Sequence, residues 1–157
     1  MNIADQLAAW GETQKVLVQL SEEPNESPWR EDFETVLKFA EINNPWFTRD
    51  QQLTAIKGIA RLLEPESLKT WIEKYEVKSN APKKVGVIMA GNIPLAGFHD
   101  FLSVLISGNH LVAKLSGSDR HLLPFIAKIL FSFSPELASR FEISDQLKTV
   151  RCDSDRE

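Results

Sequence analysis

Two polar side chains in the second half of the chain follow short apolar runs, where they could act on a ligand. Asn92 lies in the turn Gly91-Asn92-Ile93-Pro94, and Lys114 ends the next apolar run. At the carboxyl end of a strand, an asparagine amide facing a cleft can donate a hydrogen bond to a developing oxyanion. The alternative is an ordinary turn, in which Gly91 supplies backbone freedom and Pro94 starts a helix. Lys114 alone is equally well interpreted as a solvated charge.

The apolar pattern predicts the elements that position these residues. Strands are predicted at residues 84–89 and 110–114 and could begin again at 141–143, with helices at 95–107 and 119–133. The first strand is a continuous apolar run rich in valine and isoleucine, which predicts burial on both faces. Gly108 is expected to end the first helix in the left-handed conformation. This order predicts a parallel β-α-β unit with functional side chains at the strand ends.

Residues 1–80 are predicted to form a layer of four helices, because apolar residues recur there every three to four positions. Ser27-Pro28 is expected to cap the second helix, Thr48 with Gln51 to form a capping box for the third, and Pro65 to open the fourth. Large aromatic residues on helical faces are usually core anchors. We therefore expect core positions for all four tryptophans, which are Trp10, Trp29, Trp46 and Trp71.

Composition restricts the class of protein. The chain has 157 residues, 43% of them hydrophobic, and a net charge of −4, which is enough apolar material for a packed core. No basic cluster exceeds the pair Lys83-Lys84, so a nucleic acid partner is not expected. The first residues lack a signal-peptide pattern, and no apolar run approaches the ~20 residues of a membrane span. We expect a cytoplasmic protein without a transmembrane segment.

The remaining reactive residue types give weak signals. His99, His110 and His121 are spaced by eleven residues, but they fall on different predicted elements and lack metal-ligand spacing, so no metal site is predicted. A structural role is expected for His99 and its neighbour Asp100. Cys152 is the single cysteine and lies in a polar, acidic stretch that would not favour a thiolate, so we do not expect it to be catalytic.

Three stretches of the sequence resemble a known family. They are Asn43-Asn44-Pro45-Trp46-Phe47-Thr48, the Gly91-Asn92-Ile93-Pro94 turn with Gly97-Phe98-His99-Asp100-Phe101-Leu102, and Ser107-Gly108 through Ser116. Together they resemble the acyl-CoA reductases of the bacterial bioluminescence type, distant relatives of the aldehyde dehydrogenases. The likeness covers about half of the chain. It implies an α/β fold, with an amino-terminal helical layer followed by a partial Rossmann-like parallel β-α-β unit of aldehyde dehydrogenase type.

The resemblance also implies a chemistry. A full family member reduces a fatty acyl-CoA with NADPH through a covalent acyl-cysteine, giving a fatty aldehyde and free CoA. By this resemblance Asn92 would stabilise the oxyanion, and the cofactor would be bound by Gly91, Ile93, Lys114 and Ser116. The family places the lysine against the adenosine ribose hydroxyls. Leu115 follows that lysine here, where aldehyde dehydrogenases usually have proline, and the bioluminescence-type reductases share this variation.

The resemblance divides the chain into a helical segment at 1–80, a partial cofactor-binding unit at 81–149 and a tail at 150–157. A frameshift near Lys148 that truncated a longer reductase would explain why the sequence turns abruptly polar. The tail would then be unstructured and Cys152 exposed. We expect the amino-terminal part of a reductase, inactive alone and with at most weak NADPH binding. The alternative is a non-catalytic binding or oligomerisation module. With few strands to cover the sheet edges, we expect a homo-oligomer.

Overall fold

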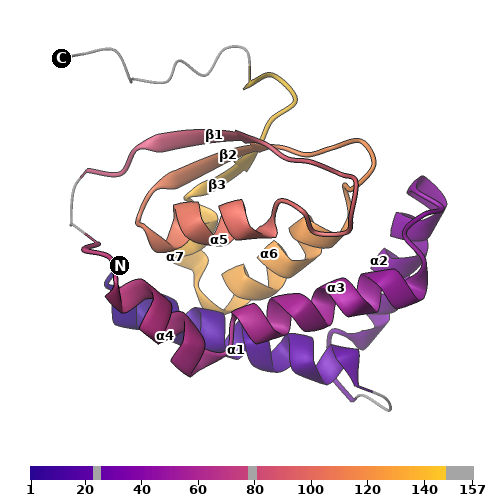
Figure 1. The fold of residues 1–157 in the computed structure, drawn as a ribbon, viewed down its shortest axis with the longest axis horizontal. Helices are drawn as coiled ribbons and strands as arrows, with labels where there is room; N and C mark the ends of the chain where they lie inside the picture. The colour runs from indigo at the N-terminus through magenta and orange to yellow at the C-terminus, as the bar shows by residue number, and fades with distance from the viewer. Residues whose placement is uncertain (23–25, 78–80, 148–157) are drawn as a thin grey trace.

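The computed structural model describes residues 1–22, 26–77 and 81–147. The protein is mixed α/β and mostly helical, with one small parallel sheet (Figure 1). Four helices come first: α1 (Ile3–Ser21), α2 (Arg30–Asn43), α3 (Arg49–Leu62) and α4 (Pro65–Glu73). The second half runs β1 (Lys84–Ile88), α5 (Phe98–Ile106), β2 (His110–Lys114), α6 (Leu122–Phe133), α7 (Pro135–Ala138) and β3 (Phe141–Ile143). The predicted tail and Cys152 lie outside the described residues.

The three strands form a parallel sheet in the order β1-β2-β3, so the predicted third strand is confirmed. Consecutive parallel strands joined by right-handed crossovers place both connecting helices on one face. Figure 1 shows α5 and α6 beneath the sheet, with α1, α3 and α4 beneath them and α2 at the right-hand side. The prediction that the first strand is buried on both faces is therefore wrong. Val85 and Val87 face the helices and are partly buried, whereas Ile88 is 76% exposed on the other face.

Local capping signals explain several helix boundaries. Thr48 Oγ1 accepts a hydrogen bond from the Gln51 amide at 3.3 Å, Pro65 is the first residue of α4, and Gly108 has the left-handed φ of 84°. The cap at Thr48, the start of α4 at Pro65 and the left-handed stop at Gly108 are confirmed. The full capping box is not, because the described residues show no hydrogen bond from the Thr48 amide to the Gln51 side chain. The predicted cap at Ser27 is wrong, because Ser27 Oγ accepts from the Trp29 amide and so stabilises the turn before α2, which begins later.

Two helices begin three residues later than predicted. α5 begins at Phe98 because Leu95 has a φ of 61°, which an α-helix does not allow. α6 begins at Leu122 because the preceding residues form a turn in which the Asp119 amide donates to the Ser116 carbonyl at 3.1 Å. In both cases, residues that were predicted to begin the helix belong to the loop between the strand and the helix.

α6 lies at the centre of the hydrophobic core. Seven of its residues are buried. Its Phe125 stacks on Phe33 of α2 at a centroid distance of 5.9 Å, and its Phe131 contacts Phe141 of β3 at 5.8 Å. The helix therefore packs against the amino-terminal helices on one side and against the sheet on the other.

The tryptophans divide between core and surface. Trp10 of α1 is fully buried and packs edge-on against Phe98 and Phe101 of α5, as predicted. Trp46 is 82% exposed, so the prediction that it anchors the core is wrong. The turn after α2 instead places Phe47 in the core at 1% exposure, with its amide donating to the Asn44 carbonyl. Trp46 and Phe47 are consecutive, and their side chains leave the tight turn in different directions.

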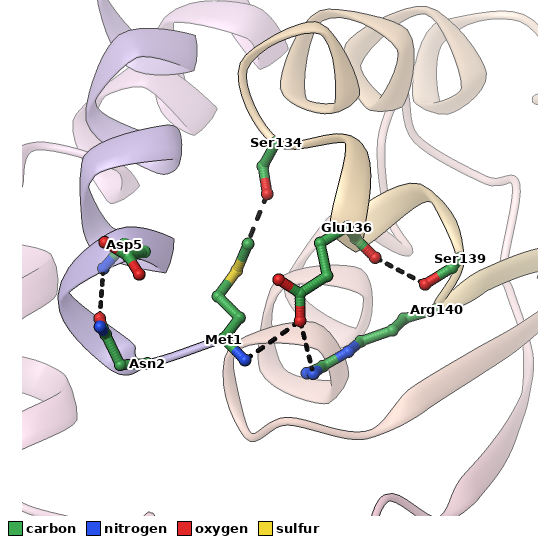
Figure 2. Close-up of polar contacts among 7 residues, drawn as sticks. All are labelled: Met1, Asn2, Asp5, Ser134, Glu136, Ser139 and Arg140. Atoms are coloured by element: carbon green, nitrogen blue, oxygen red, sulfur yellow. Dashed lines mark hydrogen bonds and ion pairs between the residues drawn. The ribbon is translucent and has the colours of Figure 1, made fainter.

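The start of α1 is joined to α7 by a polar cluster (Figure 2). The α-amino nitrogen of Met1 lies 3.1 Å from Glu136 Oε1, and Arg140 Nη2 lies 3.5 Å from the same oxygen. Ser134 Oγ donates to the Met1 sulfur. Glu136 is half exposed, so each ion pair contributes little to stability. The contacts fix where the first helix begins relative to the sheet-containing half.

The position of α6 between two layers predicts a large difference between two phenylalanines of this helix. Phe125→Ala should lower the free energy of unfolding by about 3–5 kcal/mol, because it removes a buried ring that packs against Trp29 and Phe33 of the amino-terminal layer. Phe133→Ala, at a 41% exposed position, should change it by less than about 1 kcal/mol. Urea denaturation followed by circular dichroism measures both. Equal losses would contradict the central place of α6.

Candidate functional site

The loops that follow β1 and β2 lie side by side at one edge of the sheet. Ile88 pairs with Lys114 in the parallel register, and the Met89 amide donates to the Lys114 carbonyl at 2.9 Å. The carboxyl ends of parallel strands are where α/β sheets usually bind ligands. The turn at residues 91–94 and the loop at residues 115–119 are therefore the candidate site.

Gly91 and Ser116 are in direct contact across this edge. A Cβ added to Gly91 would overlap Ser116 Oγ and would lie 2.5 Å from the Ser116 Cβ and 3.3 Å from the Ser118 Cβ. Only glycine allows the two loops to approach this closely. The structure thus brings together two of the residues that the sequence predicted for one site, and gives Gly91 a packing role.

Asn92, Ile93 and Lys114 are left more open. Asn92 is exposed, Ile93 is 59% exposed and Lys114 is half-buried. Among the described residues, the side chains of Asn92 and Lys114 have no hydrogen-bond or ion-pair partner. An amide and an ammonium group at the same edge of the sheet are therefore available to an acceptor-rich ligand.

Ser116 is partly engaged in its own loop. Its Oγ accepts a hydrogen bond from the Ser118 amide at 3.2 Å, and its carbonyl accepts from the Asp119 amide. The hydroxyl oxygen therefore stabilises the loop, and the hydroxyl proton remains available to be donated to a ligand.

The end of α2 supports this loop from the helical layer. Asn43 Nδ2 donates to the Gly117 carbonyl at 2.9 Å, and Asn44 Nδ2 donates to the Ser118 carbonyl at 3.3 Å. Arg120 Nη2 donates to Asn43 Oδ1 at 3.0 Å, closing a small network. The sequence pattern had assigned no supporting role to these asparagines. Two adjacent asparagines at a helix end, in one of the stretches that carry the family resemblance, were the signal that could have indicated this supporting role.

Asp119 is a second residue that the sequence did not single out. Its side chain is 9% exposed, and Oδ2 accepts a hydrogen bond from the Leu95 amide at 2.8 Å. Burial raises the pKa of the Asp119 carboxyl above its usual value, and the bond from Leu95 opposes this more weakly. The other oxygen, Oδ1, is buried without a partner among the described residues.

The histidines do not converge. His99 Nδ1 lies 3.4 Å from Ser103 Oγ and its ring contacts Trp71, whereas the His121 ring stacks on Phe39. No group of three or more potential metal ligands occurs within residues 1–22, 26–77 and 81–147. None of the described helices has both the length and the apolar character needed to cross a membrane.

A pocket of about 450 Å³ lies at the opposite end of the sheet. Its walls include Trp71 and Tyr75, and it also contacts Lys83 and Asn109, which precede β1 and β2. Because it adjoins the amino ends of the strands, it is separate from the candidate site.

Comparison of the chain with protein-family models, with curated proteins and with solved structures gives no match. What the structure establishes is the class: a mixed α/β protein with a small three-stranded parallel sheet. The function therefore has to be argued from the site itself.

The contact between Gly91 and Ser116 predicts a specific coupling. Gly91→Ala should lower the free energy of unfolding by about 1–3 kcal/mol through overpacking, and Ser116→Gly in the same chain should recover much of this loss. Gly117→Ala is the matched control, because nothing lies within 4 Å of its added Cβ. Urea denaturation of the double-mutant cycle tests the coupling, and purely additive effects would show that the loops are not in contact.

Asp119 predicts a pH-dependent difference in stability. Because its pKa is raised in the folded state, the folded protein binds the proton more tightly, and stability falls as pH rises from the unfolded value of 3.8 through the folded value. Asp119→Asn keeps an oxygen acceptor for Leu95 without the buried charge. The variant should be more stable than the parent near neutral pH, and this advantage should shrink below the unfolded pKa. Denaturant titrations at several pH values measure it; a constant difference would contradict the shift.

Proposed function

We propose that this chain is the amino-terminal part of an NADPH-dependent fatty acyl-CoA reductase and that the candidate site is its cofactor side. The observation that carries the proposal is the contact between Gly91 and Ser116. It places side by side the two loops that the family resemblance assigns to one cofactor site. The parallel register of β1 and β2 supports the same interpretation, because nucleotide ligands bind at the carboxyl edge of such sheets.

The residues present fit this role. Lys114 is half-buried and without a partner among the described residues, so its ammonium group can bind ribose hydroxyls or a phosphate oxygen. Ser116 can donate its hydroxyl proton beside it, and Gly91 with Ile93 would form the wall of the turn. The exposed Asn92 amide would donate to the carbonyl oxygen of a thioester as negative charge develops there. NADPH, when bound, would supply the hydride.

Turnover is not expected from this chain. Thioester reduction through an acyl-enzyme needs an activated thiol near the oxyanion donor. The single thiol, Cys152, lies outside the described residues and has Asp153 beside it in the sequence. The proposal is therefore cofactor binding without catalysis by the chain alone.

A second candidate function is an oligomerisation module derived from the same fold. Large apolar side chains that are strongly exposed favour it: Ile42 at 77%, Trp46 at 82% and Ile88 at 76%. Exposed apolar patches commonly mark association surfaces. An interface on the open face of β1 would be compatible with the first function, whereas one at the end of α2 would adjoin the loop that Asn43 and Asn44 support.

The cofactor proposal predicts weak, site-specific binding. Isothermal titration should detect NADPH binding, and Lys114→Ala should weaken it about tenfold or more by removing a charged hydrogen bond. Lys84→Ala is the matched control, since this lysine lies in β1 at the opposite end of the register. Equal weakening by both substitutions would indicate non-specific charge attraction. Absence of binding by the unaltered chain would remove the proposal.

The association proposal predicts a dimer or larger species at micromolar concentration. Trp46→Ser should shift sedimentation toward the monomer if the end of α2 forms the interface, whereas Ile88→Ser should do so if the open sheet face forms it. Either substitution removes an exposed side chain and should leave folding intact. A monomeric parent protein that binds no hydrophobic dye would exclude this function.

A further inference from the structure

An unusual backbone conformation lies directly after the turn of the candidate site. Leu95 has a φ of 61°, and among the residues that the structure describes it is the single non-glycine residue with a positive φ. The left-handed region is energetically unfavourable for an L-residue other than glycine. The Leu95 side chain is buried at 5% exposure, so the core needs this side chain in spite of the cost. Some other interaction must hold the backbone there.

The Asp119 carboxylate provides that interaction. Its Oδ2 accepts from the Leu95 amide at 2.8 Å across 24 residues of sequence. A bond to a charged acceptor is stronger than one between neutral groups. Asp119 is itself fixed, because its amide donates to the Ser116 carbonyl and because Asn43 and Asn44 hold the two residues before it.

The turn that follows β1 is thus held at both ends. Gly91 is fixed by its contact with Ser116, and Leu95 is fixed by Asp119. Three residues lie between these points, and one of them is Pro94, whose ring restricts φ. The two ends therefore restrict the backbone position from which the exposed Asn92 side chain projects, and this side chain adds no hydrogen bond of its own within the described residues.

We infer that Asp119 is a positioning residue for Asn92: its carboxylate holds Leu95 in the left-handed conformation and so fixes the turn that carries the Asn92 amide. The role given to Asn92 rests on the proposed function, whereas the hydrogen bond and its effect on the turn do not. Strained backbone conformations cluster at functional sites.

Nuclear magnetic resonance of the full chain tests this inference. In the unaltered protein, a scalar coupling across the hydrogen bond should join the Leu95 amide nitrogen to the Asp119 carboxyl carbon. Asp119→Ala should speed hydrogen exchange of the Leu95 amide about tenfold or more and shift the Asn92 side-chain amide resonances, with α6 amides still protected. Asp119→Asn, which keeps the acceptor, should restore both signals. Asp100→Asn, at an exposed position, is the control.

Several results would overturn the inference. They are absence of the coupling in the unaltered protein, an Asp119→Ala variant whose Leu95 exchange is unchanged, and a change at Leu95 that leaves Asn92 unaffected. If Asp119→Ala does not fold, the inference is tested by two remaining measurements. They are the scalar coupling in the unaltered protein and the Leu95 and Asn92 signals of Asp119→Asn. Titration of NADPH into the same samples separates the two proposals. Loss of the resonance effects with binding intact removes the positioning role, and absence of binding with these effects intact removes the cofactor proposal.

Discussion

α6 is buried by the sheet on one side and by the amino-terminal helices on the other, so both layers depend on one helix for their core. Phe125 faces α2 and Phe131 faces β3. The buried residues form one cluster that includes Trp10, α5 and α6. The site loops begin and end on the elements that this cluster holds in place.

The order of the strands explains why the sheet is covered on one face. Strands added in sequence, each by a right-handed crossover, place every connecting helix on the same side. Parallel sheets are usually covered on both faces, so the exposed Ile88 is unusual for the class. This open side is a surface on which a further layer or a second copy would bury apolar area.

The candidate site is held by contacts from three distant segments. Asn43 and Asn44 support the loop after β2, Asp119 fixes Leu95 in the turn after β1, and Gly91 lets the two loops touch. The exposed Asn92 and the half-buried Lys114 make no such supporting contacts among the described residues, which suits groups that interact with a ligand. Supporting residues and ligand-facing residues are thus different sets here.

The sequence by itself determined the features that depend on near neighbours: the caps at Thr48, Pro65 and Gly108, the order of strands and helices, and the turn that contains Gly91. Each is set by interactions within a few residues, which a sequence pattern records directly. Tertiary structure decided the later start of α5, the exposure of Trp46 and the supporting roles of Asn43 and Asp119. These depend on hydrogen bonds between residues 24 to 74 positions apart and on which face of a turn meets the core. Contacts between residues so far apart in the sequence leave no local pattern from which they could be predicted.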